Sequence, residues 1–219
     1  MSDPTVGIAP PLISPIIDAG SLYLLKGNHV YLEFLREQDR EPLRRLAKDE
    51  RLWEFTKTLL INDTYDLQFD SYFNEALGLA SIGEQAFVIR DLNDERIIGM
   101  TRLFAIERKN KKLEIGHTWY IPAVWGRIHN KECKLLLLQY VLGTLGFNRV
   151  QFRVAHQNIR SQKAVEKIGG VKEGVLRRDS IRNDGSRRDT VIFSIITDEW
   201  PETRANLLLL IAAAEGGPS

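Results

Sequence analysis

The residues from Leu113 to Tyr120 read LEIGHTWY, and those from Asn130 to Leu138 read NKECKLLLL. The first segment alternates apolar with polar side chains, which is typical of a β-strand with one buried face. The second segment extends to Thr144 as a predicted helix that is apolar on nearly all sides and is therefore packed inside the protein. Together the two segments predict a sheet with a buried helix next to it.

Upstream of this pair, the hydrophobic period changes from two residues to the helical spacing and back again. The expected elements are, in chain order, a strand from His29, one or two helices between Leu43 and Leu60, a helix from Phe69 to Leu79, and strands from Ala86 to Arg90 and from Ile97 to Phe104. A turn at 91–94 joins the last two strands as a hairpin, which predicts an antiparallel meander.

Downstream, a clean alternation and two strong turn signals define the remaining elements. The expected elements are a strand from Arg149 to Ala155, a helix that opens after Asn158 and ends at Gly169 and Gly170, strands from Val171 to Arg178 and from Thr190 to Ile196 around a turn at 183–186, and a short helix from Leu207 to Ala214. This order predicts a mixed α/β (α+β) protein. It lacks the regular strand and helix alternation of a dinucleotide-binding fold.

The composition is that of an ordinary folded protein. Of 219 residues, 43% are hydrophobic and 27% are charged, and we expect one main domain. The 30 basic and 29 acidic residues nearly cancel, so we expect no nucleic-acid partner. Five arginines flank the turn at 183–186, and the aspartates interleaved with them favour a solvated hairpin over a phosphate site. The arginines are Arg177, Arg178, Arg182, Arg187 and Arg188, and the aspartates are Asp179, Asp184 and Asp189.

Cysteine and histidine usage argues against disulfides and metal sites. Cys133 is the single cysteine, which excludes an internal disulfide and suits a reducing compartment. The four histidines are scattered, so we predict no metal. The N-terminus lacks a signal-peptide pattern, and the longest uncharged run falls short of a bilayer span. We therefore expect a cytoplasmic protein without a membrane partner.

Four stretches in this order resemble GNAT acyltransferases, and in particular the branch typified by ribosomal-protein N-terminal acetyltransferases. They are LEIGHTW at 113–119, NKECKLLLL at 130–138, NIRSQKA at 158–164 and EGVLR at 173–177. The resemblance covers about His29 to Pro201. It implies the GNAT fold, with a mostly antiparallel central sheet, splayed strands and flanking helices. The implied organisation is an N-terminal arm (1–27), an acyltransferase domain (28–201) and a C-terminal helix or tail (202–219).

The same resemblance implies acetyl-CoA as co-substrate and a primary amine as acceptor, either a protein N-terminus or a small molecule. The pyrophosphate of CoA would lie on the turn before the leucine-rich helix, because backbone N–H groups at a helix start bind anions. The turn consists of Trp125, Gly126, Arg127, Ile128, His129 and Asn130. Of the residues in the family pattern, this sequence keeps only Gly126. Ala123 replaces the first anchor, and Ile128 stands where glycine or alanine is usual, so its side chain could crowd the phosphates while Arg127 and His129 supply charge.

The pantetheine arm of CoA resembles an extra strand in this family, held where two parallel strands splay apart. The neighbours here would be the strands at 113–120 and 149–155. Backbone groups of Trp119, Tyr120 and Ile121 would bind the arm from one side, and the Asn158 side chain could reach it from the other. Asn158 also suits a helix N-cap, and the two roles need not exclude each other.

Amine acylation needs a group that removes a proton from the ammonium and a donor for the departing thiolate. Glu114 is the candidate base, and a salt-bridged strand glutamate is the alternative. Ser161 matches the serine near the CoA sulfur in this branch, and an ordinary first-turn serine is the alternative. His117 shares the parity of Ile115 and Trp119, which favours a packed histidine. Trp53 and Phe55 are candidate walls of the acceptor pocket, although aromatic residues at helical spacing are more often core.

Three functions thus stay open. The leading hypothesis is direct attack of the amine on acetyl-CoA in a ternary complex. A succinyl or similar donor would require an additional cation near the thioester, and no residue was identified for that role. A non-catalytic acyl-CoA-binding regulator is the third, because the turn at Ile128 departs from the family pattern. The sequence leaves monomer and homodimer open.

Overall fold

The structure, a computed structural model of the chain, describes residues 24–58, 60 and 63–215. Most of the predicted N-terminal arm (1–27) and the end of the predicted tail (202–219) lie outside the described residues. The described part of the arm ends in a short strand, Leu24–Lys26, which pairs with the first predicted strand of the domain. Lys26 pairs with Tyr31, so this part of the chain belongs to the sheet.

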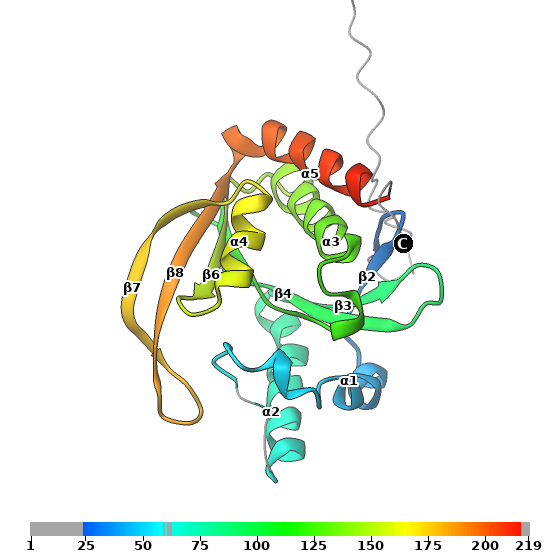
Figure 1. Cartoon of the computed structure of the whole chain (residues 1–219), viewed down its shortest axis with the longest axis vertical. Helices are drawn as coiled ribbons and strands as arrows, with labels where there is room; N and C mark the ends of the chain where they lie inside the picture. The colour runs from blue at the N-terminus through cyan, green and yellow to red at the C-terminus, as the bar shows by residue number, and fades with distance from the viewer. Residues whose placement is uncertain (1–23, 59, 61–62, 216–219) are drawn as a thin grey trace, which may run out of the picture.

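One eight-stranded sheet runs through the described residues, in the order β1-β2-β3-β4-β5-β6-β8-β7 (Figure 1). The strands are β1 (Leu24–Lys26), β2 (Val30–Phe34), β3 (Gln85–Asp91), β4 (Ile97–Glu107), β5 (Lys112–Tyr120), β6 (Arg149–Ala155), β7 (Val171–Ile181) and β8 (Arg187–Ile196). Neighbouring strands pair antiparallel except β5 and β6, which pair parallel. The predicted mixed, mostly antiparallel sheet is confirmed.

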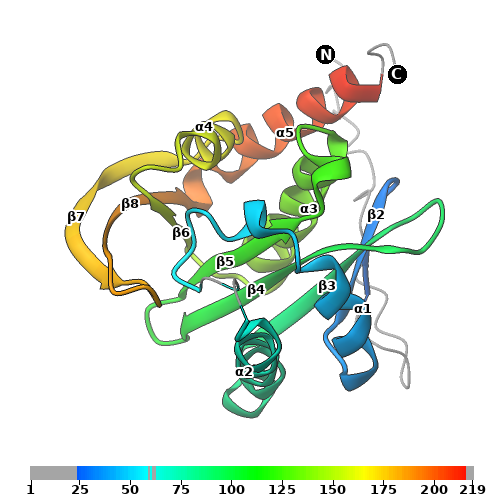
Figure 2. The ribbon, with the colours of Figure 1, turned by 60° about the horizontal axis from the view of Figure 1, so that its bottom comes forward.

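Helices cover both faces of the sheet (Figures 1 and 2). They are α1 (Arg40–Leu46), α2 (Tyr65–Gly78), α3 (Ile128–Leu138), α4 (Ile159–Lys167) and α5 (Trp200–Glu215). Helices α3, α4 and α5 lie on one face, and α1 and α2 lie on the other, as Figure 2 shows. The apolar residues accordingly form two buried clusters, one on each face of the sheet.

The leucine-rich helix explains the larger cluster. Leu136, Leu137 and Leu138 of α3 are completely buried, as are Val150 on β6 and Phe193 on β8. On the other face, aromatic residues of α2 pack with apolar side chains of β3 and β4. Both faces of β3 to β5 are thus buried, which explains why β4 reads as a nearly continuous apolar run.

Several helix boundaries differ from the sequence prediction. Helix α1 ends at Leu46 and, among the described residues, is followed only by a short turn at 50–52, where helix was expected through Leu60, and α2 begins at Tyr65 rather than Phe69. The predicted helix to Thr144 is α-helical only to Leu138 and continues as a π-helical turn, in which Leu145 N–H bonds to Tyr140 O at 2.9 Å. The C-terminal helix begins at Trp200 rather than Leu207 because Pro201 lies in its first turn, where proline needs no N–H partner.

Candidate functional site

Strands β5 and β6 are paired only at their beginning. The parallel ladder joins Lys112–Glu114 to Arg149–Gln151, and no further pair connects the strands, although β5 continues to Tyr120 and β6 to Ala155. Facing backbone groups beyond Glu114 and Gln151 are therefore not bonded across this part of the sheet. An extended ligand can bond to such an edge as an added strand does.

A bulge in β5 produces this divergence. Met100 pairs with Trp119 and Arg102 with Gly116, so β5 has one more residue than β4 in this interval. His117 in the bulge has a φ of +48°, which is unusual for a residue with a side chain. The bulge ends the simple alternation of β5. The residue is exposed overall, but its ring packs against Phe104 and Tyr72, at centroid distances of 5.1 and 6.4 Å, so His117 is partly packed rather than the packed core histidine that the alternation predicts.

Close approach of β4 to this bulge requires a glycine. A Cβ atom on Gly99 would lie 2.2 Å from the backbone oxygen of Trp119, a contact that only glycine avoids. The His117 imidazole has a lowered pKa because neighbouring protein atoms desolvate it and because Arg102, Lys57 and Arg188 carry positive charge nearby. His117 is thus neutral at physiological pH.

Glu114 lies at the last β5–β6 pair, where the strands begin to diverge. Its Oε1 accepts a hydrogen bond from Gln151 Nε2 at 2.9 Å, whereas its Oε2 is buried without a partner among the described residues. Burial raises the pKa of the Glu114 carboxyl, opposed by the positive charges of Arg153 and Lys57. A half-buried carboxylate with a raised pKa and a vacant acceptor atom is suited to proton transfer.

The turn before α3 has the geometry of an anion site. Gly126 has a φ of +74°, and α3 begins at Ile128 with no side chain capping its first N–H groups. Arg127 is exposed at the N-cap and Ile128 is half-buried against the core. The His129 imidazole is buried and lies 3.1 Å from Asp91, so only its backbone N–H remains at the helix start.

The start of α4 lies across from this turn. Asn158 caps the helix, because its Oδ1 accepts a hydrogen bond from the Ser161 N–H at 3.0 Å. The Arg160 guanidinium lies 4.1 Å from the Trp125 ring centroid, which joins α4 to the turn before α3. Ser161 is half-buried, and no described group bonds to its hydroxyl. Asn130, in the first turn of α3, is half-buried as well.

The end of β5 and the residue after it are held in place by packing and by hydrogen bonds. Trp119 and Tyr120 are buried, and Ile121 donates its N–H to the Ile98 oxygen at 2.8 Å. Trp125 Nε1 donates to the Tyr120 oxygen at 2.6 Å. Trp119 packs tilted against Trp53, at a centroid distance of 6.1 Å.

Trp53, one of the two candidate pocket walls, is a core residue. Its exposure is 1%, and its Nε1 donates to the Ala47 oxygen at 2.7 Å. Phe55 is half-buried in the segment that follows the short helical turn at 50–52. The bulk of Trp53 is therefore used to hold α2 and β5 together, and Phe55 keeps some exposed surface.

Two polar groups of this site were not identified from the sequence. Lys134 of α3 is buried, and its Nζ donates to Thr118 Oγ1 at 3.2 Å, 5.8 Å from the Phe152 ring centroid. The amine thus lies between β5 and β6 beyond their last pair, and burial lowers its pKa. The signal in the sequence was a lysine next to a run of leucines. A helix that is apolar on all sides is buried, and a charged residue on it is buried as well.

The arginine-rich hairpin is the second feature that sequence reasoning missed. Arg182 is half-buried and donates to backbone oxygens of Thr56, Trp53 and Glu54, and Asn183 N–H bonds to the Lys57 oxygen at 3.3 Å. The β7–β8 hairpin is thereby fastened to the segment at 53–57. The prediction of a solvated hairpin is wrong for Arg182, because its guanidinium donates to backbone carbonyls of the segment at 53–57.

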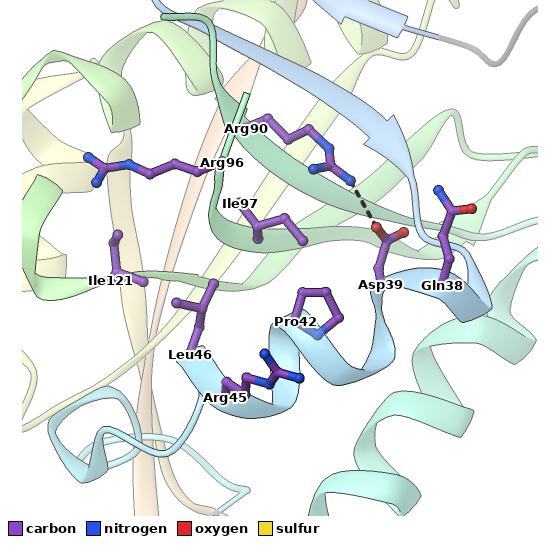
Figure 3. Close-up of a pocket in the computed structure, with 9 residues that line it drawn as sticks. All are labelled: Gln38, Asp39, Pro42, Arg45, Leu46, Arg90, Arg96, Ile97 and Ile121. Carbon is purple, nitrogen blue, oxygen red and sulfur yellow. Dashed lines mark hydrogen bonds and ion pairs between the residues drawn. The ribbon is translucent and has the colours of Figure 1, made fainter. Parts of the chain in front are cut away.

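A shallow pocket of about 520 Å³ lies elsewhere, between α1 and the start of β4 (Figure 3). Three arginines line it, and Arg90 forms a 2.9 Å ion pair with the buried Asp39. Ile121 is the residue that this pocket shares with the predicted donor site. Among residues 24–58, 60 and 63–215, no cluster of metal-ligating side chains is present, and no helix is long and apolar enough to cross a bilayer.

Comparison with known proteins identifies the family of this chain. A curated relative from Bacillus subtilis (strain 168), named "Putative ribosomal N-acetyltransferase YdaF", is 33% identical over 110 residues, which are 50% of this chain and 58% of that protein. The chain thus spans a little over half the length of this relative. A GCN5-related N-acetyltransferase structure from Brucella melitensis is 25% identical with a TM-score of 0.79, over 91% of this chain and 89% of that one.

A more distant structure shares the fold alone. The spermidine N-acetyltransferase of Vibrio cholerae, in complex with CoA and spermine, is 19% identical with a TM-score of 0.65, over 78% of this chain and 98% of that one. Residues 29–171 match the family model described as an acetyltransferase (GNAT) domain. Because this match covers more than half of the chain and the structure has the corresponding sheet, the protein belongs to the GNAT acetyltransferase family.

Proposed function

We propose that this protein transfers an acetyl group from acetyl-CoA to a primary amine. The observation that carries the proposal is the joint position of Glu114 and the unpaired edges of β5 and β6. The edges can bind an extended arm, and the vacant Oε2 of Glu114 lies where the edges begin. A carboxylate with a raised pKa at that point suits the removal of a proton from an ammonium group.

The donor site has features that fit CoA. The uncapped start of α3 and the exposed Arg127 would bind the pyrophosphate, since a helix N-terminus attracts anions. Ile128 points its bulk into the core cluster, which reduces the expected crowding of the phosphates. Backbone groups of Trp119 to Ile121 would bind the pantetheine arm, and Asn158 would contact it from α4 while it caps that helix.

The proposed reaction uses two side chains of the chain. Acetyl-CoA supplies an activated thioester carbonyl. Glu114 accepts a proton from the acceptor ammonium through a water molecule, and the amine nitrogen then bonds to the carbonyl carbon as the carbon–sulfur bond breaks. The nitrogen loses its second excess proton to solvent as the amide forms. Ser161 donates its hydroxyl proton to the departing thiolate and regains a proton from solvent. The products are an amide and the free CoA thiol.

The first test is donor binding. Acetyl-CoA at a hundredfold excess over its dissociation constant should stabilise the folded protein by about 2.7 kcal/mol, because it binds only the native state. For a chain of this size, that corresponds to a rise in melting temperature of roughly 5 to 10 °C. An unchanged melting curve at millimolar acetyl-CoA contradicts the proposal. Binding without CoA release on a broad amine panel supports the non-catalytic alternative.

One observation favours a second donor. A succinyl group would need a cation near the thioester, and the buried Lys134 Nζ lies between β5 and β6 with a hydroxyl as its hydrogen-bond partner. The carboxylate of a bound succinyl group would stabilise the protonated form of Lys134, which burial disfavours. Running the CoA-release assay with both acetyl-CoA and succinyl-CoA separates the two donors.

A further inference from the structure

The face of the sheet that carries Glu114 continues over β6, β8 and β7 as a row of polar side chains. Arg153 on β6 and Asp179 on β7 form an ion pair, with Arg153 Nη2 2.6 Å from both carboxylate oxygens. Thr190 Oγ1 also donates to Asp179, at 2.7 Å. Asp179 is thus fully occupied by these partners, and their hydrogen bonds and charge lower the pKa of its carboxyl.

Arg188 lies next to this pair without an acidic partner of its own. Its Nε is buried and unbonded, and within the described part of the chain no carboxylate lies in ion-pair distance of it. Ser180, its direct cross-strand neighbour, has a buried hydroxyl that is also unbonded. A guanidinium beside a free hydroxyl presents several donors and lacks an acceptor, which matches the needs of a carboxylate.

The strand register shows that these donors share a face with Glu114. Glu114 pairs with Gln151, which pairs with Ser194, and paired residues project to the same side. Arg188 lies six residues before Ser194 on β8, an even number, so it projects to that side as well. In Figure 2 the helices α3, α4 and α5 lie on the opposite side of β6 and β8.

The charges around this face are mainly positive. Lys57 is exposed, and its charge lowers the pKa of the carboxyl groups of Glu114 and Asp179. Desolvation lowers the pKa of Arg188, the negative charge of Asp179 opposes this, and the charges of Arg153 and Arg182 add to the lowering. A polyamine would add further positive charge here, whereas an acidic group would relieve the repulsion.

We propose that the acceptor is a peptide N-terminus with a carboxylate side chain among its first three residues. Arg188 and Ser180 bind that carboxylate while Glu114 faces the α-amine. This inference rests on the proposed function. Arg188 lies six residues along β8 from Ser194, roughly 20 Å, and Ser194 lies two strand spacings, about 10 Å, from Glu114, so the two Cα atoms are about 22 Å apart. The Arg188 and Glu114 side chains, extended toward each other, leave about 10 Å, the span of about three extended residues. A free α-amino acid is too short to reach both groups.

The test compares matched peptides. Tetrapeptide amides with aspartate at the second or third position should be acetylated with a kcat/KM about tenfold to a hundredfold above their asparagine counterparts. Spermidine and free aspartate should be poor acceptors. Binding of the same peptides, measured by fluorescence anisotropy without any CoA present, should show the same preference. Equal kcat/KM and equal binding for aspartate and asparagine peptides overturn the inference.

Variants locate the preference on the sheet. Arg188→Gln should remove most of the aspartate preference, measured as the ratio of kcat/KM for the aspartate peptide to that for the asparagine peptide. Arg187→Gln is the matched control, because Arg187 is exposed and projects to the other side of β8. Arg188→Glu should favour a lysine peptide over an aspartate peptide. If Arg188→Glu keeps the aspartate preference while its melting temperature shows a folded protein, the carboxylate does not bind at Arg188.

The two proposals fail in different ways. Acetylation of all peptides at similar rates supports the proposed acetyl transfer and contradicts the proposed binding of an acidic side chain. Aspartate-dependent peptide binding without acetyl transfer keeps the subsite and removes the catalytic proposal. If the enzyme prefers free amino acids with longer side chains and shows no preference among peptides, the peptide assignment is also overturned.

Discussion

Two glutamates on consecutive elements of the chain, the half-buried Glu114 of β5 and the buried Glu132 of α3, have opposite surroundings. Glu132 of α3 accepts three backbone N–H groups at the β1–β2 turn, from Asn28, His29 and Val30, at 2.8, 2.7 and 2.8 Å. Glu114 of β5 accepts one amide hydrogen bond and keeps one oxygen without a partner. The first carboxylate is saturated and the second is not.

The difference separates a structural role from a chemical one. A saturated carboxylate has no acceptor atom left for a substrate proton, and its hydrogen bonds stabilise the fold. It fastens α3 to β2, and a Cβ on Gly27 would lie 2.5 Å from the Glu132 carboxyl carbon. An unsaturated carboxylate costs folding free energy, which is commonly tolerated at functional sites. Each of the following predictions tests one side of this contrast.

The largest expected effect is on the rate of the Glu114→Gln variant. Acetyl transfer should fall about a hundredfold to ten-thousandfold at neutral pH, because the amide cannot take a proton. The shape of the side chain is kept, so acetyl-CoA binding should be preserved. The loss should shrink as the pH approaches the pKa of the amine, where free base becomes abundant. A pH–rate profile of both proteins on one acceptor measures this.

Two outcomes of that profile would contradict base catalysis. An unchanged rate from about pH 6 to pH 9 removes Glu114 from the mechanism. A uniform loss at every pH indicates damaged positioning instead. Glu132→Gln serves as the comparison in the same assay, because it lies away from the β5–β6 opening and its rate per folded molecule should stay near that of the parent.

The stability of the folded protein should be affected in the opposite order, more by Glu132→Gln than by Glu114→Gln. Glu132→Gln replaces an acceptor with an amide whose N–H₂ faces backbone N–H donors, so the free energy of unfolding should fall by about 3 kcal/mol. The corresponding fall in melting temperature is roughly 6 to 12 °C. Glu54→Gln is the control, because Glu54 is exposed and its side chain makes no contact among the described residues. A Glu132→Gln variant as stable as this control would refute the structural role.

The arrangement of the elements was largely predictable from local patterns. Alternation in LEIGHTWY and in the strand at 149–155 predicted β5 and β6, and the leucine run predicted α3. These patterns work because burial on one face imposes a period on the side chains. The bulge at His117 was not predictable. Its positive φ is imposed by the pairing of β4 with β5, and the residue that adopts it is a histidine rather than a glycine.

The chemistry of the site was predictable only in part. Glu114 was found by its face of β5, and Asn158 by its position before α4. Arg188 looked solvated because acidic residues alternate with the arginines, yet Asp179 is used by Arg153 and leaves Arg188 unpaired. Pairing across strands decides which charge is neutralised, and the chain order does not contain that information.

The smallest expected effect is the pH dependence of stability in the Glu114→Gln variant. The pKa of Glu114 is raised from its ordinary value of 4.5 because burial disfavours the charged form. The protonated carboxyl is therefore favoured in the folded protein, and stability is lost as the pH rises from 4.5 through the raised pKa. Glutamine resembles the protonated form and never ionises. The stability of the variant relative to the parent should therefore rise between acid and neutral pH. Denaturant unfolding of both proteins at pH 4 and pH 7 measures the difference, and Glu54→Gln corrects for general charge effects. A difference that stays constant across this range would mean that Glu114 is as well solvated as an exposed carboxylate, and the contrast with Glu132 would then rest on hydrogen bonding alone.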